Sequence, residues 1–317
     1  MIFLDLGMMK RIFADLLILI TALFFPLLTY GQKDNKKCIK LPDYLKEVSG
    51  LYIEGPEKMW WHNDGGNSPS LYQTDGRGKL LEEVNLATLK NRDWEDITSD
   101  DNGRIYIGDF GNNRNQRKDL KIYIYNRETE NIDSISFKYP DQKEFPPNVE
   151  DWNFNAEGFF WFQDSLHLFS KNRLHQGNYF TKHYVLPAQS GNYVAQLVDS
   201  IYLKNRVVTG AAISPDKKTV GLIAYTYKKV LGFIPWSAAS IYLIQNFQGS
   251  QFLRGNIYKK KAPGFILATQ MESIDFFDNE TLYIASEKTK FIQPKAKRVR
   301  LKKRHLKKTK KTKKIKE

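Results

Sequence analysis

The segment Glu95-Asp96-Ile97, followed by the turn Asp100-Asp101-Asn102-Gly103 and the run Ile105-Tyr106-Ile107, carries the pattern that decides the fold. An acidic or small polar residue, a hydrophobic residue two places later, a turn and a second β-rich run recur at intervals of 46 to 63 residues. The other four segments are Ser49-Gly50-Leu51, Glu157-Gly158-Phe159, Thr209-Gly210-Ala211 and Glu272-Ser273-Ile274. Repeats of this length filled with short strands are typical of propeller blades. The sequence therefore predicts an all-β protein, a β-propeller with five antiparallel four-stranded blades.

The fifth repeat stops early, because the chain becomes lysine-rich soon after its second strand, Leu282-Tyr283-Ile284. Propellers commonly close by adding an N-terminal strand to the last blade, and Cys38-Ile39-Lys40-Leu41 is expected to be that strand. A sixth blade that lacks the repeated pattern stays open, because the longest intervals exceed what one four-stranded blade needs.

The N-terminal residues have the pattern of an export signal. Two basic residues precede the apolar run 16–28, which is short for a membrane span, and Thr29 and Gly31 then provide a cleavage site. We therefore expect a signal peptide at 1–31 and an exported protein that is periplasmic, attached to the cell surface or secreted. An uncleaved N-terminal anchor is the alternative.

The composition separates a neutral folded domain from a basic C-terminal segment. One cysteine, Cys38, cannot form an internal disulfide, so the propeller predicted at 32–290 must be stabilised by its hydrophobic core. The stretch 288–317 holds 16 of the 49 Lys and Arg residues and one acidic residue, which leaves the rest of the chain close to neutral. We expect a lysine-rich, disordered tail at 291–317 that contacts anionic surfaces, and a monomeric domain that does not bind nucleic acid.

The repeated first position of each blade is expected to line the central channel, because the innermost strand of a propeller blade faces the axis. This first ring consists of Ser49, Glu95, Glu157, Thr209 and Glu272. A second ring falls where each second strand ends, and it consists of Asp64, Asp109, Lys171, Tyr225 and Glu287. Carboxylates that converge on one axis repel each other unless they are protonated, hydrogen-bonded or neutralised by a cation.

Two interpretations of these carboxylates are open. They hold Ca²⁺ or another hard cation, or they accept hydrogen bonds from backbone N–H groups and tie neighbouring blades together. The candidate metal ligands are Glu95, Glu157, Glu272, Asp64 and Asp109. The candidate ligand-binding residues are Asn67, Asn112, Lys171, Arg173, Tyr225 and Glu287.

The block Asp93-Trp94-Glu95-Asp96-Ile97 is followed by Ile105-Tyr106-Ile107-Gly108-Asp109-Phe110-Gly111-Asn112-Asn113, and Trp61-His62-Asn63-Asp64-Gly65-Gly66-Asn67 stands one blade earlier. Together these segments resemble exported bacterial propellers of the SdiA-regulated and phytase-like kind, over about 41–287. The resemblance implies a calcium site formed by carboxylates around the channel. The chain departs from the family in its short last blade and in the lysine-rich segment that follows. The shared Asp-x-Gly-Asn pattern is typical of tight turns, and it also brings carboxylates and amides to one channel mouth.

Three functions follow from this site. The first is binding of a small molecule or envelope component at the channel mouth through calcium. The second is metal-dependent hydrolysis of phosphoric or carboxylic esters, and the third is a protein interaction scaffold. Nucleophilic catalysis has little support, because the chain has no Gly-x-Ser-x-Gly motif and His62, beside Asp64, is the sole candidate base.

Overall fold

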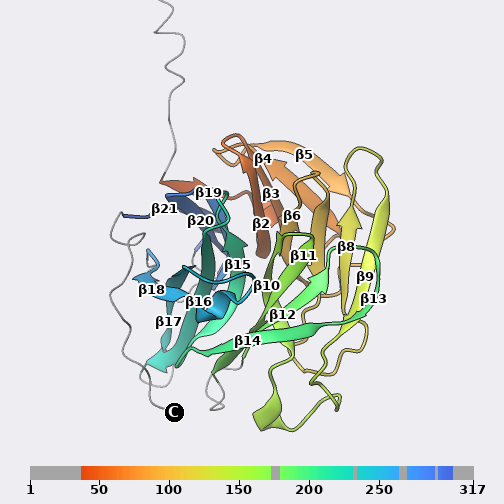
Figure 1. Cartoon of the computed structure of the whole chain (residues 1–317). Coiled ribbons are helices and arrows are strands. Elements are labelled where there is room, and N and C mark those ends of the chain that lie inside the picture. Colours follow the sequence, from red (N-terminus) through yellow and green to blue (C-terminus); the bar gives the residue numbers. More distant parts are fainter. Residues whose placement is uncertain (1–36, 173–178, 231–233, 264–269, 290–291, 303–317) are drawn as a thin grey trace, which may run out of the picture. The chain divides into compact units, whose positions relative to one another are not determined.

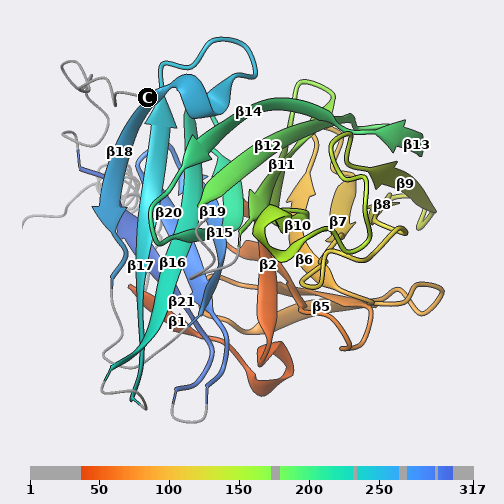
Figure 2. The ribbon, with the colours of Figure 1, turned by 90° about the horizontal axis from the view of Figure 1, so that it is seen from below.

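The computed structural model describes residues 37–172, 179–230, 234–263, 270–289 and 292–302. Within these residues the chain forms five β-sheets that follow one another around a common centre (Figure 1, Figure 2). The predicted all-β propeller with five blades is confirmed, and the described residues contain no sixth sheet. The predicted signal peptide lies outside the described residues. No helix among the described residues is long and apolar enough to cross a membrane.

Each blade is a mainly antiparallel sheet whose strands run outward from the centre in chain order. Blade 1 consists of β2 (Val48–Gly55), β3 (Lys58–Asn63), β4 (Ser70–Thr74) and β5 (Leu80–Asn85). Blade 2 consists of β6 (Trp94–Ser99), β7 (Ile105–Asp109), β8 (Lys121–Tyr125) and β9 (Ile132–Lys138). Blade 3 consists of β10 (Asn155–Phe162), β11 (Ser165–Lys171), β12 (Phe180–Pro187) and β14 (Gln196–Tyr202). Blade 4 consists of β15 (Val207–Ile213), β16 (Thr219–Val230), β17 (Ile234–Gln245) and β18 (Asn256–Lys261).

One additional strand links two blades. The segment β13 (Gly191–Val194) lies in the connection between β12 and β14 of blade 3, and it pairs in parallel with β9 at the outer edge of blade 2. Blade 2 therefore has five strands, and its edge is covered by the next blade. Covering an edge in this way removes exposed backbone donors and acceptors.

The core lies between the blades. Five clusters of buried hydrophobic residues each join one blade to the next, including a cluster that joins blade 5 to blade 1. Adjacent residues of one strand enter different clusters, because successive side chains point to opposite faces of a sheet. Trp60 and Trp61 of β3 pack on opposite faces of blade 1 in this way. Burial on both faces explains why the second strands contain short continuous apolar runs, such as Met59-Trp60-Trp61 in β3 and Ile105-Tyr106-Ile107 in β7.

Blade 5 closes the ring with strands from both ends of the described chain. It consists of β19 (Met271–Asp278), β20 (Thr281–Ser286), β21 (Lys295–Arg300) and β1 (Cys38–Lys40). The prediction that the N-terminal strand completes the last blade is confirmed, since β1 pairs antiparallel with β21.

The predicted start of the tail at residue 291 is wrong, because β21 belongs to the propeller. Ala296 is buried between blades 5 and 1, whereas Val299 and Leu301 are buried between blades 4 and 5. The two-residue spacing of Val299 and Leu301 is a weak strand signal, and the abundance of lysine masked it. Residues 303–317 of the predicted tail lie outside the described residues.

Shortening Val299 tests this placement of β21. Val299→Ala is expected to lower the free energy of unfolding by about 1.5–2.5 kcal/mol, because it removes two buried methyl groups and leaves a cavity. Arg300→Ala, on the exposed face of the same strand, is the matched control and should change it by less than about 0.5 kcal/mol. Urea denaturation of both variants gives the comparison. Equal, negligible effects would return this segment to the tail.

A β-bulge interrupts every innermost strand at the position predicted for the first ring. In blade 2, Trp94 pairs with Asp109 and Asp96 pairs with Gly108, so Glu95 is the extra, unpaired residue. The same shift occurs in the other four blades, where the extra residues are Ser49, Glu157, Thr209 and Glu272. A bulge redirects the side chain of its extra residue. The repeated sequence pattern therefore marks five equivalent bulges at one end of the channel.

Candidate functional site

The blades are tied together at this end by hydroxyl groups and not by the glutamates of the ring. Ser49 Oγ donates to the backbone oxygen of Glu95 at 2.6 Å, and Thr209 Oγ1 donates to that of Met271 at 2.5 Å. Ser273 Oγ likewise donates to the backbone oxygen of Ser49 at 2.5 Å. These contacts join neighbouring blades at the bulge residues or at the residues next to them.

Two aspartates deeper in the channel, and not the ring glutamates, accept hydrogen bonds from backbone N–H groups of neighbouring blades. Asp96 accepts from Phe159 at 3.1 Å, and Asp275 accepts from Ile53 at 2.6 Å. No backbone N–H group among the described residues donates to the side chains of the ring glutamates. The interpretation in which carboxylates tie neighbouring blades together therefore applies to Asp96 and Asp275. The ring carboxylates do not have this role within the described residues.

Three carboxylates meet where blades 1 and 2 adjoin. One oxygen each from Asp64, Asp93 and Glu95 lies within 4.8 Å of the other two. Asp64 directly follows β3, Asp93 directly precedes β6, and Glu95 is the bulge residue of β6. None of the three forms an ion pair with a basic side chain of the described residues. We call this group the three-carboxylate centre.

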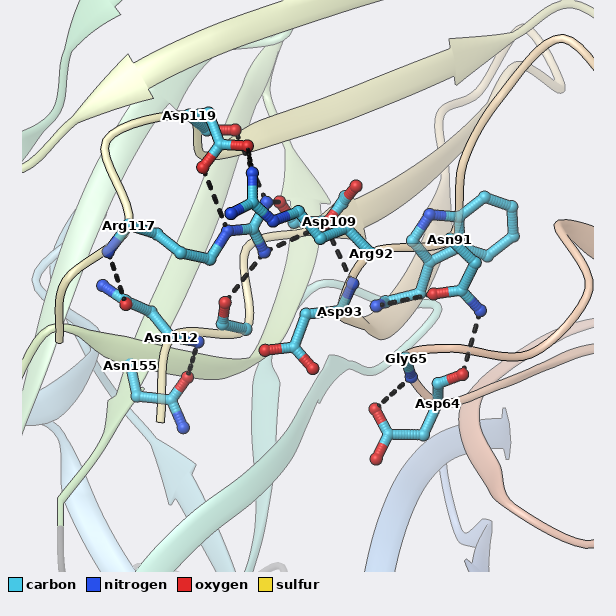
Figure 3. Close-up of polar contacts among 12 residues, drawn as sticks. Asp64, Gly65, Asn91, Arg92, Asp93, Asp109, Asn112, Arg117, Asp119 and Asn155 are labelled. Carbon is cyan, nitrogen blue, oxygen red and sulfur yellow. Dashed lines mark hydrogen bonds and ion pairs between the residues drawn. The ribbon is translucent and has the colours of Figure 1, made fainter. Parts of the chain in front are cut away.

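Asparagine side chains and turn contacts fix the two loops that carry this centre (Figure 3). Asn91 donates to the backbone oxygen of Asp64 at 2.9 Å and accepts the N–H of Trp94 at 3.1 Å, so it connects the loops. The Gly65 N–H group donates to Asp64 Oδ1 at 2.6 Å, and the Asp93 N–H group donates to Asp109 Oδ1 at 3.2 Å. These bonds position the carboxylates before any ligand arrives.

Glycine is required next to the centre. A Cβ atom at Gly111 would overlap Glu95 Oε1 and the carboxylate of Asp93, and one at Gly65 would lie 2.7 Å from Asp93 Oδ1. Both glycines belong to the Asp-x-Gly-Asn turns of the sequence. Neither Gly65 nor Gly111 has a positive φ, so the requirement here is space and not backbone conformation.

Filling this space is expected to disturb the centre. Gly111→Ala should lower calcium affinity about tenfold or more, because the methyl group displaces two of the three carboxylates from their common position. Gly55→Ala, where an added Cβ meets nothing within 4 Å, is the control and should leave the affinity unchanged. Isothermal titration calorimetry with CaCl₂ measures both variants. Unchanged affinity in Gly111→Ala would remove the centre from the metal site.

The other half of the ring is organised around one ammonium group. Lys171 Nζ forms an ion pair with Glu157 Oε2 and lies 5.8 Å from the ring centre of Tyr225. Asn155 donates to Glu157 Oε1 at 2.8 Å. Glu272 Oε1 is buried without a hydrogen-bond partner in the described chain, and Glu287 Oε2 accepts from Gln270 at 3.1 Å. Lys171 thus contacts a carboxylate of this half directly, whereas it acts on the three-carboxylate centre without a direct ion pair among the described residues, by opposing the rise in the pKa of Asp93 and Glu95.

The titration behaviour follows from an excess of carboxylates over cations. Burial, and then the neighbouring Asp64, raise the pKa of Asp93 to about 6. Burial raises the pKa of Glu157 and that of Glu272 to about 8, even though Lys171 opposes the change. Burial alone would lower the pKa of Lys171, but Glu157 and the surrounding groups outweigh it and hold that pKa well above the usual range. Without a metal the ring therefore retains protons near neutral pH.

These shifts set the sign of a pH effect. A carboxyl whose pKa is raised on folding stabilises the fold at low pH, and this stabilisation is lost as the pH rises through the folded value. In chelator, the melting temperature is therefore expected to fall between about pH 4.5 and pH 8 and to level off above that, because over this range the folded protein keeps protons on Glu157 and Glu272 that the unfolded chain has released. Calcium should reduce the fall by stabilising the ionised form. Calorimetric melting curves check this, and a melting temperature that rises over the same range in chelator contradicts it.

The structure brings most of the predicted residues together at this mouth, with exceptions. Asp109 is turned away toward Arg117, at 3.0 Å, and is not part of the three-carboxylate centre (Figure 3). The side chain of Asn112 holds the next blade, donating to the backbone oxygen of Phe154 at 3.0 Å. Asn67 fixes its own turn through the backbone oxygen of Asp64 at 2.9 Å. Arg173 lies outside the described residues.

Two residues need a different interpretation from the sequence-based one. His62 is fully buried, and burial lowers its pKa to about 4, so it is not suited to act as a base. Asp93 was not among the predicted metal ligands, although it belongs to the quoted block and lies two residues before Glu95. Asp93 lies just outside β6 and Glu95 is the bulge residue, so the alternation of side chains along a strand did not indicate that the two carboxylates meet.

No protein-family model matches the chain, and a search of curated proteins finds no match. Solved structures with a similar arrangement include an α-L-arabinofuranosidase from Fusarium graminearum, with 10% identity, 84% of this chain and 98% of that chain covered, and a TM-score of 0.49. A gluconolactonase from Xanthomonas campestris has 12% identity, 82% and 88% coverage and a TM-score of 0.44. Hydrazine synthase from Kuenenia stuttgartiensis has 14% identity and a TM-score of 0.38, and the match covers 83% of this chain and 60% of that one. The propeller assignment rests on the strand order described above.

Proposed function

We propose that this protein binds a divalent cation, Ca²⁺, at the channel mouth and uses it to hold a small ligand. The observation that carries the proposal is the three-carboxylate centre, in which Asp64, Asp93 and Glu95 converge without a basic partner among the described residues. Carboxylate oxygens are the ligands that Ca²⁺ prefers, and Ca²⁺ takes six to eight of them. Three protein carboxylates leave positions for water or for oxygens of a ligand.

The surroundings of the centre favour an anionic ligand. A cavity of about 290 Å³ adjoins Asp93 and is lined by Arg92, Arg114 and Arg117 together with asparagine side chains. Arg92 and Arg117 are paired with aspartates, whereas Arg114 is exposed and forms no ion pair in the described part of the chain. A carboxylate or phosphate bound to the cation has an arginine within the same cavity.

Calcium-dependent stabilisation tests the proposal. A cation that binds only the folded protein raises the melting temperature by mass action. At a free cation concentration of about 100 times Kd, the free energy of unfolding rises by about 2.7 kcal/mol. The exported domain should therefore melt at a higher temperature in millimolar CaCl₂ than in EDTA. An identical melting temperature in the two buffers would remove the metal and leave an interaction scaffold as the remaining reading.

Metal-dependent hydrolysis of a phosphoric or carboxylic ester is the second candidate, and the arginine-lined cavity beside Asp93 favours the phosphoric ester. In that case the bound cation polarises the substrate and Arg114 neutralises its charge. This reading would extend the resemblance to SdiA-regulated and phytase-like propellers from sequence to activity. Turnover of a phosphomonoester panel in CaCl₂, lost in EDTA, separates hydrolysis from binding alone.

The proposal includes export, because the sequence at 1–31 has the order of a signal peptide and calcium is more abundant outside the cytoplasm. The ligand would then be a small molecule or an envelope component in the periplasm, at the cell surface or in the medium. The basic residues after 302 add an attraction to anionic surfaces, by about 1 kcal/mol per charge close to the surface.

A further inference from the structure

A second cavity lies farther along the innermost strands, and its lining begins at Leu51 and Ile97, two residues after the bulge residues of their strands. It has a volume of about 160 Å³ and is lined by the C-terminal parts of the innermost strands of all five blades. Its apolar wall includes Leu51, Ile97, Phe160 and Phe276, each at most 3% exposed. A cavity of about 150 Å³ in another protein holds benzene, which gives the size of ligand that fits. We call it the lower channel cavity.

The cavity contains a carboxylate that can accept hydrogen bonds from a ligand. Asp275 lines the cavity, and no basic side chain among the described residues forms an ion pair with it within 4.0 Å. Its oxygens accept backbone N–H groups from Ile53 at 2.6 Å and Phe276 at 2.8 Å, so the carboxylate is held in place. Each carboxylate oxygen has a further lone pair. The cavity therefore presents a fixed acceptor that carries a negative charge when ionised.

Aromatic side chains stand beside this carboxylate. Tyr52, Phe160 and Trp161 line the same cavity, and Trp161 is 8% exposed. The faces of such rings attract organic cations, and the attraction increases when water is excluded. Trp161 Nε1 is buried without a hydrogen-bond partner in the described residues, so the indole also has an unused donor.

The chain already places one ammonium group against this wall. Lys217 Nζ lies 5.1 Å from the ring centre of Trp161, and Lys217 is a lining residue of the cavity. Its side chain is 38% exposed, and its ion pair with the exposed Asp101 is long, at 3.7 Å. A surface pair of this kind contributes little to stability, so the lysine is easily displaced. The ammonium group of Lys217 thus lies against a wall that is suited to cations, and it is held there only weakly.

We propose that the lower channel cavity binds a small organic ammonium ion, about the size of benzene, with Asp275 as its counter-charge and the rings of Tyr52 and Trp161 as its walls. This site is independent of the cation at the channel mouth.

Benzylammonium is a suitable probe, and benzyl alcohol and benzoate are its neutral and anionic counterparts. Calorimetric titration is made at about pH 8, where a carboxyl with the pKa of Asp275, raised by burial to about 7, is mostly ionised. Saturable binding of benzylammonium, at least about tenfold tighter than that of either counterpart, is the expected result. Equal or tighter binding of benzoate, or no saturable binding of benzylammonium, overturns the proposal.

Two substitutions with opposite expected effects on affinity identify the charged side chain that is responsible for binding. Asp275→Asn is expected to weaken benzylammonium binding about tenfold, which is the loss of one charged hydrogen bond. Lys217→Ala should instead tighten it, because the competing ammonium is removed. Lys217 is exposed, so that variant folds even if Asp275→Asn, which changes a backbone acceptor, does not. A Lys217→Ala variant that binds benzylammonium more weakly would contradict the proposal by itself.

Discussion

Asp93→Asn is expected to weaken calcium binding by about 100-fold or more, because an amide replaces one of the charged ligands that converge at the three-carboxylate centre. The same change should leave the protein in chelator as stable as the wild type or more stable. The reason is that burial and Asp64 already disfavour the ionised form of Asp93. Calorimetric titration with CaCl₂ and urea denaturation in EDTA measure the two effects separately.

Asp109→Asn provides the contrast for this prediction. Asp109 belongs to the same blade and was predicted to bind metal as well, but it is paired with the buried Arg117. Its loss should therefore destabilise the protein by a similar amount with and without calcium, since it leaves the arginine short of a partner. If Asp109→Asn instead abolishes calcium binding and Asp93→Asn does not, the cation lies elsewhere in the loop.

Lys171→Met is expected to lower the free energy of unfolding by about 3–5 kcal/mol at alkaline pH, because it leaves Glu157 buried without its counter-charge. The effect should shrink toward pH 6, where the unpaired carboxyl becomes neutral by protonation. Guanidinium denaturation over this pH range measures it.

The double variant Lys171→Met/Glu157→Gln is the control for the lysine. It removes both charges, so most of the stability should return. Calcium at the three-carboxylate centre is held by other side chains, and the double variant should still bind it. A double variant as unstable as Lys171→Met would mean that the lysine acts through packing and not through charge.

The fold was predictable because the repeated residues occupy a structural position that is present in every blade. Ser49, Glu95, Glu157, Thr209 and Glu272 mark the same bulge in five strands, and a repeated backbone irregularity leaves a repeated sequence. The strand β21 was not predicted, because its buried residues, Ala296 and Val299, lie three positions apart and do not alternate regularly. The charge of the surrounding lysines outweighed them.

The location of the site could be predicted from the sequence, but the residues that belong to it could be predicted only in part. The ring positions follow from the repeat, but the partner of each carboxylate depends on loop contacts between blades. Asp109 pairs with the residue just before the bulge of its blade, whereas Asn63 has that place in blade 1, so Asp64 lies one residue farther along than Asp109. Asp109 is therefore directed elsewhere, and it pairs with Arg117. Arg117 itself is held by the loop after β7, where its Nη1 donates to the backbone oxygen of Gly111 at 2.8 Å. No local pattern in the sequence contains that pairing.

The division of the ring into two halves also needed the structure. Lys171 follows from the repeat as a member of the second ring, but the repeat does not show that its ammonium group pairs with Glu157, on the neighbouring strand of the same blade. That pairing leaves the three-carboxylate centre without a direct ion pair among the described residues, and we therefore assign the proposed cation to this half.

The most direct test is a crystal structure of the protein grown with CaCl₂, with anomalous diffraction data to identify the ion. The proposal predicts one calcium ion within about 2.3–2.6 Å of oxygens from Asp64, Asp93 and Glu95, with Lys171 still bound to Glu157. An ion among Glu157, Glu272 and Glu287 with Lys171 displaced would contradict it, as would crystals in which millimolar calcium leaves the three-carboxylate centre without an anomalous peak.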